Sequence, residues 1–327
     1  MKIITASAGI IDPTSWYRAW GVFNDIQRRY DVTFQNYEDS LMLLGNNQRG
    51  YSWVQAIQTD VAIFQRQVGQ AAVEVAKYMK ACGIKIVFDL DDCVWEIPNS
   101  YEIKKGFNKE VLSTYDQMIE LSDMVWVSTI ELSNYLTNEG KKDKNKIHIL
   151  PNAIDLNRYS FNQFNEEGVI IWRGSATHID DIESCREEMQ ELKPSQYWGY
   201  NPVMNKPYLK VHGAQYHKHI DPALYFNVLK QSNIHAIAVP LVDNVFNRCK
   251  SNIAWLEATL SGAVCISNKV GEFKQVSLSF QEYQEVKNNS TYLESIHSNS
   301  IELVRTDYNL QKVNDKRVEL LNELLKF

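Results

Sequence analysis

Hydrophobic and polar positions occur in alternating blocks along the chain, and these blocks predict strands that alternate with helices. Short apolar runs have the length of buried strands, and amphipathic stretches of helical period follow most of them. In the first half, strands are predicted at 2–7, 32–35, 60–65, 84–89, 124–128 and 147–150, and helices at 16–29, 68–81, 108–121 and 129–137. In the second half, strands are predicted at 168–172, 209–213, 235–241 and 263–267, and helices at 179–192, 222–231, 251–261 and 310–325. This alternation predicts an α/β fold with parallel sheets covered on both faces.

A polar, asparagine-rich segment without periodicity separates the two halves at 151–165. The chain has 327 residues, more than a single core usually serves. We therefore predict two Rossmann-like, doubly wound domains at 1–155 and 156–308, followed by a C-terminal helix at 309–327. Such sheets bind ligands at the carboxyl ends of their strands, so a phosphate-bearing ligand is expected in a cleft between the domains.

The most informative stretch, 235–272, predicts a strand, a polar loop, a helix that ends at Gly262 and a second strand. This is the pattern of a right-handed βαβ unit. Four residues of the helix have the spacing of one buried face: Ile253, Leu256, Glu257 and Leu260. A buried carboxylate is rare unless it is paired or used in function. Glu257 is therefore a functional candidate, and the alternative is a helix glutamate paired with a structural arginine.

Composition narrows the class of protein. The net charge is −6, with 44% hydrophobic and 23% charged residues, which is typical of a globular domain. Neither half is strongly basic, so a large nucleic-acid-binding surface is not indicated, although a local basic groove would be compatible with the charge. The five cysteines form no CxxC pair and are expected to be reduced. Without a signal peptide or a transmembrane run, a cytoplasmic protein with no membrane span is expected.

Three segments resemble motifs of one enzyme family. They are SDMVWVSTIELSNYL at 122–136, KIHILPNAID at 146–155, and VPLVDNVFNRCKSNIAWLEATLSGAVCIS at 239–267. In this order and spacing, the sequence resembles the retaining, glycogen-synthase-like (group 1) GT-B glycosyltransferases, in a divergent form found in phages and bacteria. The resemblance implies two Rossmann-like domains facing a central cleft, with a C-terminal helix that packs back across the domain junction.

The resemblance also implies an activity. Enzymes of this family transfer a hexosyl or pentosyl group from a nucleotide-diphosphate sugar, here expected to be a UDP-sugar, to an acceptor hydroxyl with retention. The protein mainly positions the donor and stabilises the departing phosphate. The donor is a substrate, so no cofactor is required, no metal site is expected, and Mg²⁺ can be present without being essential. The acceptor is left open between a modified base in phage DNA and a glycan, and a phage-encoded enzyme would work in the host cytoplasm.

Donor-binding roles follow from the matched positions. Glu257 matches the glutamate that accepts hydrogen bonds from both ribose hydroxyls, a task suited to an acceptor-only carboxylate. Arg173 matches an arginine at a strand end that neutralises the diphosphate, for which its permanent charge and forked donors are suited. Five residues further on the family has a lysine, whereas this chain has His178, which is charged only if its pKa is raised. Cys249 replaces a second acidic residue that lies near the transferred sugar.

Further candidates surround the proposed ligand. Asn247, Lys250 and Ser251 precede or begin the helix that carries Glu257, where side chains and backbone N–H groups are expected to hold the diphosphate or sugar hydroxyls. The alternative is an exposed Lys250 and a Ser251 that only caps the helix. In the first half, Gly9 would let the backbone approach phosphate or sugar. Arg18 either reaches the cleft or lies on the outer surface of its helix.

The run DLDD at 89–92 allows several interpretations. Asp91 or Asp92 is expected to accept hydrogen bonds from hydroxyls of the transferred sugar or of the acceptor. The motif also resembles that of haloacid-dehalogenase-type phosphatases, in which Asp89 would be the nucleophile and Asp91 the acid or base beside Mg²⁺. The same run could be the metal site of a GT-A glycosyltransferase, but the second αβ half with its Glu257 unit argues against this alternative. A non-catalytic sugar-nucleotide-binding protein is a third alternative, which Cys249 in place of an acid favours.

Overall fold

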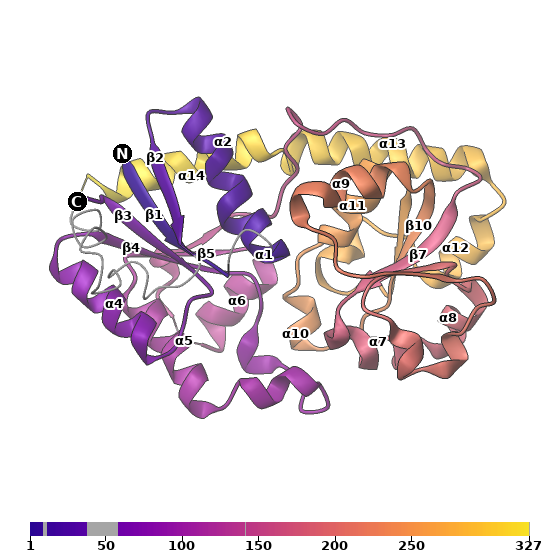
Figure 1. Ribbon diagram of the computed structural model, residues 1–327, viewed down its shortest axis with the longest axis horizontal. Coiled ribbons are helices and arrows are strands. Elements are labelled where there is room, and N and C mark those ends of the chain that lie inside the picture. The colour runs from indigo at the N-terminus through magenta and orange to yellow at the C-terminus, as the bar shows by residue number, and fades with distance from the viewer. Residues whose placement is uncertain (9–11, 38–57, 141, 327) are drawn as a thin grey trace. The chain divides into compact units, whose positions relative to one another are not determined.

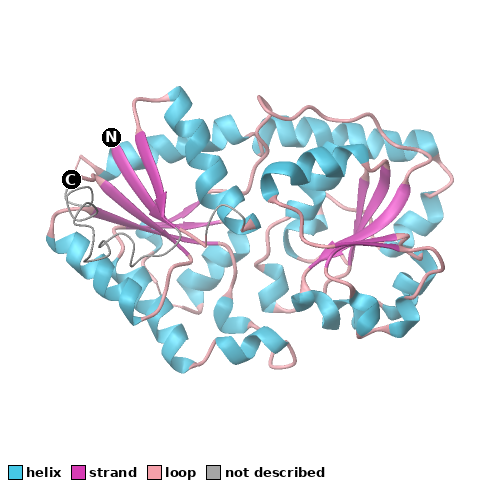
Figure 2. Ribbon diagram, in the orientation of Figure 1, coloured by secondary structure: helices cyan, strands magenta, loops and turns pink. Residues whose placement is uncertain are grey.

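The computed structural model describes residues 1–8, 12–37, 58–140 and 142–326 (Figure 1). The chain forms two compact units in an interleaved order. The first contains Met1–Trp95, Lys105–Asn152 and Leu310–Phe327, and the second contains Glu96–Lys104 and Ala153–Asn309. The predicted first domain, 1–155, includes the segment Glu96–Lys104, but in the structure this segment belongs to the second unit. In each unit, helices lie on both sides of a central sheet (Figure 2).

The first unit has a six-stranded parallel sheet in the order β2-β1-β3-β4-β5-β6. Its strands are β1 (Lys2–Ala6), β2 (Thr33–Tyr37), β3 (Val61–Gln65), β4 (Lys85–Leu90), β5 (Met124–Val127) and β6 (Ile147–Ile149). Every residue of β3 and β5 is buried, as the continuous apolar runs predict for strands covered on both faces. The strand order reverses between β1 and β3, which places a topological switch point at their carboxyl ends.

The helices of the first unit confirm most of the predicted positions. They are α1 (Pro13–Ser15), the π-helix η1 (Trp16–Trp20), α2 (Gly21–Arg29), α4 (Gln70–Ala81), α5 (Lys109–Leu121), α6 (Ile130–Asn138) and α14 (Leu310–Leu324). The single helix predicted at 16–29 is replaced by α1, η1 and α2. A Cβ at Gly21 would lie 2.5 Å from the carbonyl oxygen of Trp16, so only glycine fits the bulged turn.

The second unit has a five-stranded parallel sheet in the order β11-β10-β7-β8-β9. Its strands are β7 (Val169–Gly174), β8 (Gln196–Gly199), β9 (Gln215–His217), β10 (Ile234–Val239) and β11 (Val264–Ser267). The strand predicted at 209–213 is wrong, since β8 and β9 flank that region instead. Strand β9 is a short, largely exposed edge strand without an apolar run, which explains why periodicity missed it. The switch point of this sheet lies between β7 and β10.

Seven α-helices of the second unit lie within the described residues: α7 (Ile179–Ser184), α8 (Arg186–Leu192), α9 (Pro222–Gln231), α10 (Val245–Arg248), α11 (Ile253–Ser261), α12 (Phe280–Val286) and α13 (Ser290–Asp307). Helices α12 and α13 were not predicted. Helix α11 ends at Gly262 as predicted: the residue has φ +84°, and an added Cβ would lie 2.1 Å from the Gln163 carbonyl oxygen. Its N-cap is Asn252 and not Ser251, so the helix begins two residues later than expected.

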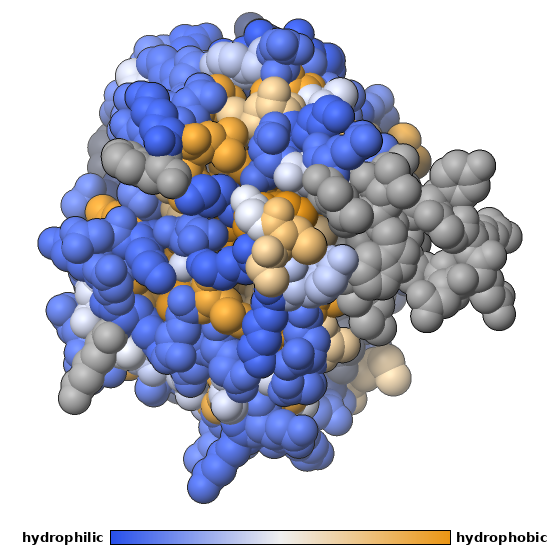
Figure 3. All heavy atoms as spheres, turned by 90° about the vertical axis from the view of Figure 1, so that its left-hand side faces the viewer, coloured by the Kyte–Doolittle hydropathy of each residue, from blue (hydrophilic) through white to orange (hydrophobic). Residues whose placement is uncertain are grey.

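Hydrophilic residues predominate on the face shown in Figure 3, and hydrophobic residues are scattered over it. This distribution agrees with sheets whose faces are covered by helices. Within the part of the chain that the structure describes, no helix combines the length and the apolar character needed to span a bilayer.

Candidate functional site

A partly buried ion pair occupies the switch point of the second unit. Arg173 lies in β7 near its carboxyl end, and Glu257 lies in the middle of α11. Arg173 Nε and Nη2 donate to Glu257 Oε2 and Oε1, each at 2.6 Å. The Glu257 side chain is 2% exposed, and the Arg173 side chain is 26% exposed. Glu257 is therefore buried, as its place in the apolar stripe predicts, and its charge is balanced by an arginine that still reaches solvent.

Tyr225, on α9, fixes the same carboxylate. Its hydroxyl donates to Glu257 Oε2 at 2.9 Å. Burial, followed by the negative charge of Glu257, raises the pKa of Tyr225 well above its ordinary value. The phenol therefore keeps its proton and remains a donor. Trp198 of β8 packs edge-on against the Tyr225 ring, with centroids 6.1 Å apart, so the tyrosine is itself held in place.

The N-terminus of α11 lies two turns or less from Glu257. The side chain of its N-cap residue, Asn252, makes no capping hydrogen bond. The first backbone N–H groups of a helix lack intrahelical acceptors and carry the positive end of the dipole, so an uncapped N-terminus favours an anion. Lys250 and Ser251 lie in the loop that leads into this turn, and both are half-buried. The loop and the helix together can accept a negatively charged group.

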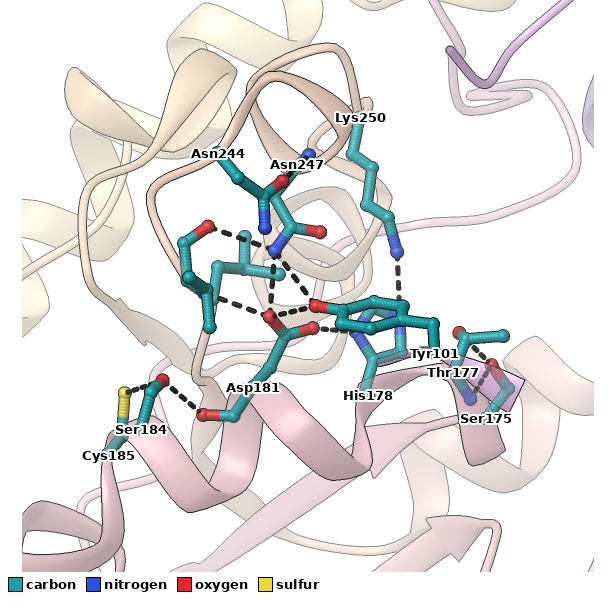
Figure 4. Close-up of polar contacts among 12 residues, drawn as sticks. Tyr101, Ser175, Thr177, His178, Asp181, Ser184, Cys185, Asn244, Asn247 and Lys250 are labelled. Atoms are coloured by element: carbon teal, nitrogen blue, oxygen red, sulfur yellow. Dashed lines mark hydrogen bonds and ion pairs between the residues drawn. The ribbon is translucent and has the colours of Figure 1, made fainter. Parts of the chain in front are cut away.

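A second network lies beside this loop and is centred on Asp181 of α7 (Figure 4). The carboxylate is completely buried. Its Oδ1 accepts hydrogen bonds from the Tyr101 hydroxyl at 2.7 Å, from Asn247 Nδ2 at 2.7 Å and from the backbone N–H of Val242 at 2.9 Å. Burial alone would raise the pKa of Asp181, but the hydrogen bond from His178 and the neighbouring charges outweigh it, so the pKa lies below the ordinary 3.8. Asp181 is an anchoring carboxylate.

His178 connects Asp181 to Lys250. Its Nδ1 lies 2.9 Å from Asp181 Oδ2, and its Nε2 lies 3.3 Å from Lys250 Nζ. Burial and the positive charge of Lys250 lower the pKa of His178. The neutral ring that fits both partners carries its proton on Nδ1 and accepts from Lys250 through Nε2. The expectation that His178 supplies positive charge to a diphosphate is therefore wrong: it is a neutral acceptor for the lysine.

The structure also corrects the expected roles of two neighbours. Asn247 is completely buried, and its amide nitrogen donates to Asp181 and, at 2.9 Å, to the Val242 carbonyl oxygen. It organises the loop and does not present its side chain to a ligand. Cys249 is 1% exposed, so the residue at the position where an acid was expected is buried in the protein. A sugar bound here would have to be held by other groups.

In the first unit, Arg18 is buried and structural. It is 0% exposed, and its Nε and Nη2 donate to Asp89 Oδ1 and Oδ2 at 2.9 and 2.7 Å. Its Nη1 donates to the carbonyl oxygen of Leu150. Both expectations for Arg18, a ligand contact or an outer-surface position, are wrong. Asp89 is equally buried, and both of its carboxylate oxygens accept hydrogen bonds from Arg18, so it cannot serve as the nucleophile of a phosphatase.

Asp91 lies just beyond the carboxyl end of β4, opposite Arg66. Arg66 Nε is 3.5 Å from Asp91 Oδ1, and Arg66 Nη1 is 3.6 Å from Asp92 Oδ2. Asp91 Oδ1 is buried and has no hydrogen-bond partner among the described residues. Burial, opposed by Arg66 and reinforced by Asp92, raises the pKa of Asp91 to about 7. A carboxylate with this pKa can exchange a proton near neutral pH.

The remaining expectations concern Gly9 and metals. Gly9 lies outside the described residues. Within the described ranges, no group of histidine, cysteine and acidic side chains is arranged to hold a metal ion. The carboxylates of Asp91 and Asp92 lie 3.5 and 3.6 Å from the Arg66 guanidinium.

Comparison with solved structures identifies the fold of this chain. An α-glucosyltransferase in complex with UDP-glucose and DNA containing an abasic site is similar over 98% of this chain and 99% of its own, with a TM-score of 0.63 at 10% identity. The chain has the GT-B fold. Anabaena HepE in complex with UDP shares this GT-B fold over 98% of this chain and 99% of its own, with a TM-score of 0.56 at 13% identity.

The GT-B fold also includes enzymes of another class. The UDP-GlcNAc 2-epimerase from Neisseria meningitidis, bound to UDP-GlcNAc, matches 99% of this chain and 100% of its own, with a TM-score of 0.53 at 14% identity. No protein-family model matches the sequence, and no curated protein matches it either. The fold predicted from the sequence is thus confirmed, while the reaction has to be argued from the site.

Three residues of the site were not predicted: Tyr101, Asp181 and Tyr225. Asp181 could have been found, because His178 and Asp181 are three residues apart and such residues lie on one face of a helix. Tyr101 and Tyr225 carried no local signal, since each meets its partner through a contact between distant segments.

Proposed function

We propose that this protein is a glycosyltransferase that takes a sugar from a nucleotide-diphosphate sugar, with a UDP-sugar as donor. One observation carries the proposal. At the switch point of a GT-B unit, an arginine with solvent access pairs with a buried glutamate near the N-terminus of α11, which its N-cap side chain does not cap. This arrangement offers an acceptor for ribose hydroxyls and donors for a diphosphate on neighbouring elements.

The ion pair suggests how the donor enters. Glu257 Oε2 already accepts two hydrogen bonds, from Arg173 and Tyr225, and Oε1 accepts one from Arg173. A carboxylate offers about four acceptor positions, so binding both ribose hydroxyls requires at least one hydrogen bond from Arg173 to break. We expect Arg173 to move from Glu257 to the diphosphate when the donor binds. The arginine then keeps an anionic partner in both states, and Tyr225 continues to orient the carboxylate.

In the proposed reaction, the protein stabilises the leaving diphosphate by positive charge and positions the reacting groups. Arg173, Lys250 and the dipole of α11 stabilise the negative charge that develops on the departing diphosphate. Transfer is proposed to proceed with retention. Asp91, with its pKa of about 7, is proposed to bind the hydroxyl of the acceptor or of the transferred sugar. No cofactor is required, and Mg²⁺ is not essential. Ser251 is proposed to contact the diphosphate through its backbone or hydroxyl.

The acceptor is proposed to be a modified DNA base or a glycan hydroxyl. The α-glucosyltransferase of similar fold was solved with DNA, which favours testing DNA first. The net charge of −6 opposes a large electrostatic footprint on DNA and favours a local contact. A glycan acceptor has no such requirement, so the salt dependence of acceptor binding would separate the two.

A second candidate is a reaction on the UDP-sugar itself, because a UDP-GlcNAc 2-epimerase shares the fold. A third is donor binding without turnover, which the buried Cys249 favours. Product analysis separates the three activities: a transferase forms a glycosylated acceptor and free nucleoside diphosphate, an epimerase forms an isomeric UDP-sugar, and a binding protein leaves the donor intact.

The decisive experiment is a screen of UDP-, GDP- and ADP-sugars for binding and for nucleoside diphosphate release, with and without EDTA. We expect binding and slow hydrolysis of a UDP-sugar that EDTA does not abolish. Glycosylated products are then sought with unmodified DNA, hydroxymethylated DNA and oligosaccharides as acceptors. Absence of binding and turnover with every nucleotide sugar would refute the proposal.

A further inference from the structure

The segment Glu96–Lys104 connects two parts of the first unit but packs within the second. The chain leaves the first unit after Trp95 and returns at Lys105. Tyr101 lies near the middle of this segment and is only 4% exposed. Its ring packs edge-on against Phe246 of α10, with centroids 5.9 Å apart, and its hydroxyl donates to Asp181 at 2.7 Å. A single buried tyrosine thus anchors the segment to the loop beside the proposed donor site.

We propose that Tyr101 is a positioning residue for donor binding, which acts on Lys250 through Asp181 and His178. The inference rests on the proposed function, because it concerns the affinity of that same site. The contacts form one continuous route from the Tyr101 hydroxyl to Asp181 Oδ1, from Asp181 Oδ2 to His178 Nδ1, and from His178 Nε2 to Lys250 Nζ, with heavy-atom distances of 2.7, 2.9 and 3.3 Å (Figure 4).

The carboxylate is the first step of this route. Asp181 Oδ1 receives three donors, from Tyr101, Asn247 and the Val242 N–H, while His178 is the partner of Oδ2. With all of these donors in place the carboxylate plane is fixed. Removal of the Tyr101 hydroxyl leaves an acceptor position empty in a completely buried group, and the carboxylate then gains freedom to rotate.

The imidazole is the second step. Only the ring with its proton on Nδ1 can donate to Asp181 and accept from Lys250 at the same time. A well-fixed carboxylate therefore selects one tautomer and one ring orientation, in the way that outer hydrogen-bond partners orient metal-ligating histidines. A Cβ at Gly174 would lie 2.6 Å from the Trp172 ring and 3.3 Å from His178 Cδ2, so glycine leaves space beside both rings.

The ammonium group is the last step. Lys250 Nζ is held by His178 Nε2 on one side and lies 4.6 Å from the centroid of the Phe246 ring on the other. Phe246 also touches the Tyr101 ring, so replacing Tyr101 by alanine would disturb both routes at once. Tyr101→Phe keeps the ring contact and removes only the hydroxyl, which donates to Asp181 at 2.7 Å and accepts from Asn247 Nδ2 at 3.5 Å. It is therefore the informative variant.

The test measures UDP binding by calorimetry. The contact of Lys250 with the diphosphate depends on sub-ångström placement of the ammonium group. Tyr101→Phe removes one hydrogen bond to the Asp181 carboxylate, which supports this placement, so we expect the Kd for UDP to rise about three- to tenfold. Tyr197→Phe is the matched control. It removes another buried tyrosine hydroxyl of the same unit, whose hydrogen bond at 3.0 Å goes to the Leu209 carbonyl oxygen outside the network. This control is expected to bind UDP as the wild type does.

The second readout is the tautomer of His178, from long-range ¹H–¹⁵N spectra assigned with His178→Gln. The wild type is expected to carry its proton on Nδ1, and Tyr101→Phe is expected to show a mixture of tautomers. An Nε2–H ring in the wild type, an unchanged Kd in Tyr101→Phe, or a changed Kd with an unchanged tautomer would each overturn the proposal. Failure of the wild type to bind UDP would instead refute the proposed function.

Discussion

Replacing Glu257 by alanine tests the assignment on which the donor site depends. If Glu257 accepts hydrogen bonds from the ribose, the wild type must prefer UDP to 2′-deoxy-UDP, and Glu257→Ala must lose this preference. The comparison is a thermodynamic cycle between one residue and one ligand hydroxyl. It isolates the ribose contact from every other consequence of the substitution.

The magnitudes show why the preference, and not the affinity, is decisive. A hydrogen bond to a charged group contributes about 1.5–3 kcal/mol, and Glu257 shares its oxygens with Tyr225, so the low end applies and the wild type should prefer UDP about tenfold. Glu257→Ala also releases Arg173, whose charge then attracts the diphosphate more strongly. The absolute Kd therefore contains two opposing effects, and only the ratio of the two Kd values reports the hydroxyl.

The same substitution affects the stability of the second unit. Breaking a fully buried ion pair costs about 3–5 kcal/mol in the free energy of unfolding. Arg173 is 26% exposed, so water restores part of its solvation and we expect a loss of about 1–3 kcal/mol. Affinity is therefore measured well below the lowered melting temperature.

The assay is calorimetric titration of wild type, Glu257→Ala and Glu282→Gln with both nucleotides. Glu282 bonds Lys269 and the Ser279 N–H, away from the site, so its variant should keep the wild-type ratio. A tenfold ratio that survives in Glu257→Ala, or a wild-type ratio of one, would refute the ribose assignment.

Three further predictions follow from the ionisable groups. Burial holds the pKa of His178 below the ordinary 6.5, so the unfolded chain binds a proton at this histidine before the folded chain does as the pH falls, and the free energy of unfolding decreases just below pH 6.5. Urea unfolding at pH 7.5 and 5.5 should therefore show a smaller decrease in His178→Gln than in the wild type. Equal decreases would contradict this prediction. The kcat of the proposed sugar transfer should rise with pH through about 7 if ionised Asp91 takes part in the reaction. Asp91→Asn should lower this kcat about 100-fold without changing the Kd for UDP. The same pH dependence of kcat in Asp91→Asn and in the wild type would exclude a role for Asp91. Arg18→Met should lower the free energy of unfolding by about 3–5 kcal/mol by leaving Asp89 buried and unpaired, and denaturant unfolding with unchanged UDP affinity would distinguish this structural role from ligand binding.

The sequence pattern predicted the fold because most strands and helices of both sheets are local features. Continuous apolar runs predicted β3, β5 and β10. The helical spacing of apolar residues, together with Gly262 at the end, predicted α11. The edge strand β9 and the break between α1, η1 and α2 were missed. The first has no apolar run, and the second depends on a backbone contact at Gly21 that hydrophobic spacing does not record.

The same distinction between local features and contacts of distant residues applies to the candidate site. Glu257 could be identified from the sequence, because a carboxylate in an apolar helical stripe must have a partner or a function. Its partners could not, because Arg173 is 84 residues away and Tyr225 is 32 residues away. For His178 and Arg18 the residue type suggested a charge for a ligand, whereas burial and close partners gave each a structural task.

What the sequence determined by itself was the α/β alternation, the two halves and the one carboxylate that needed explanation. Each of these follows from residue type and spacing along a single element. Only the tertiary structure decided that Glu96–Lys104 belongs with the second unit, that Asp181 joins Tyr101 to His178, and that Cys249 faces inward. These outcomes depend on desolvation and on hydrogen bonds between distant segments, and both are set by packing and not by local sequence.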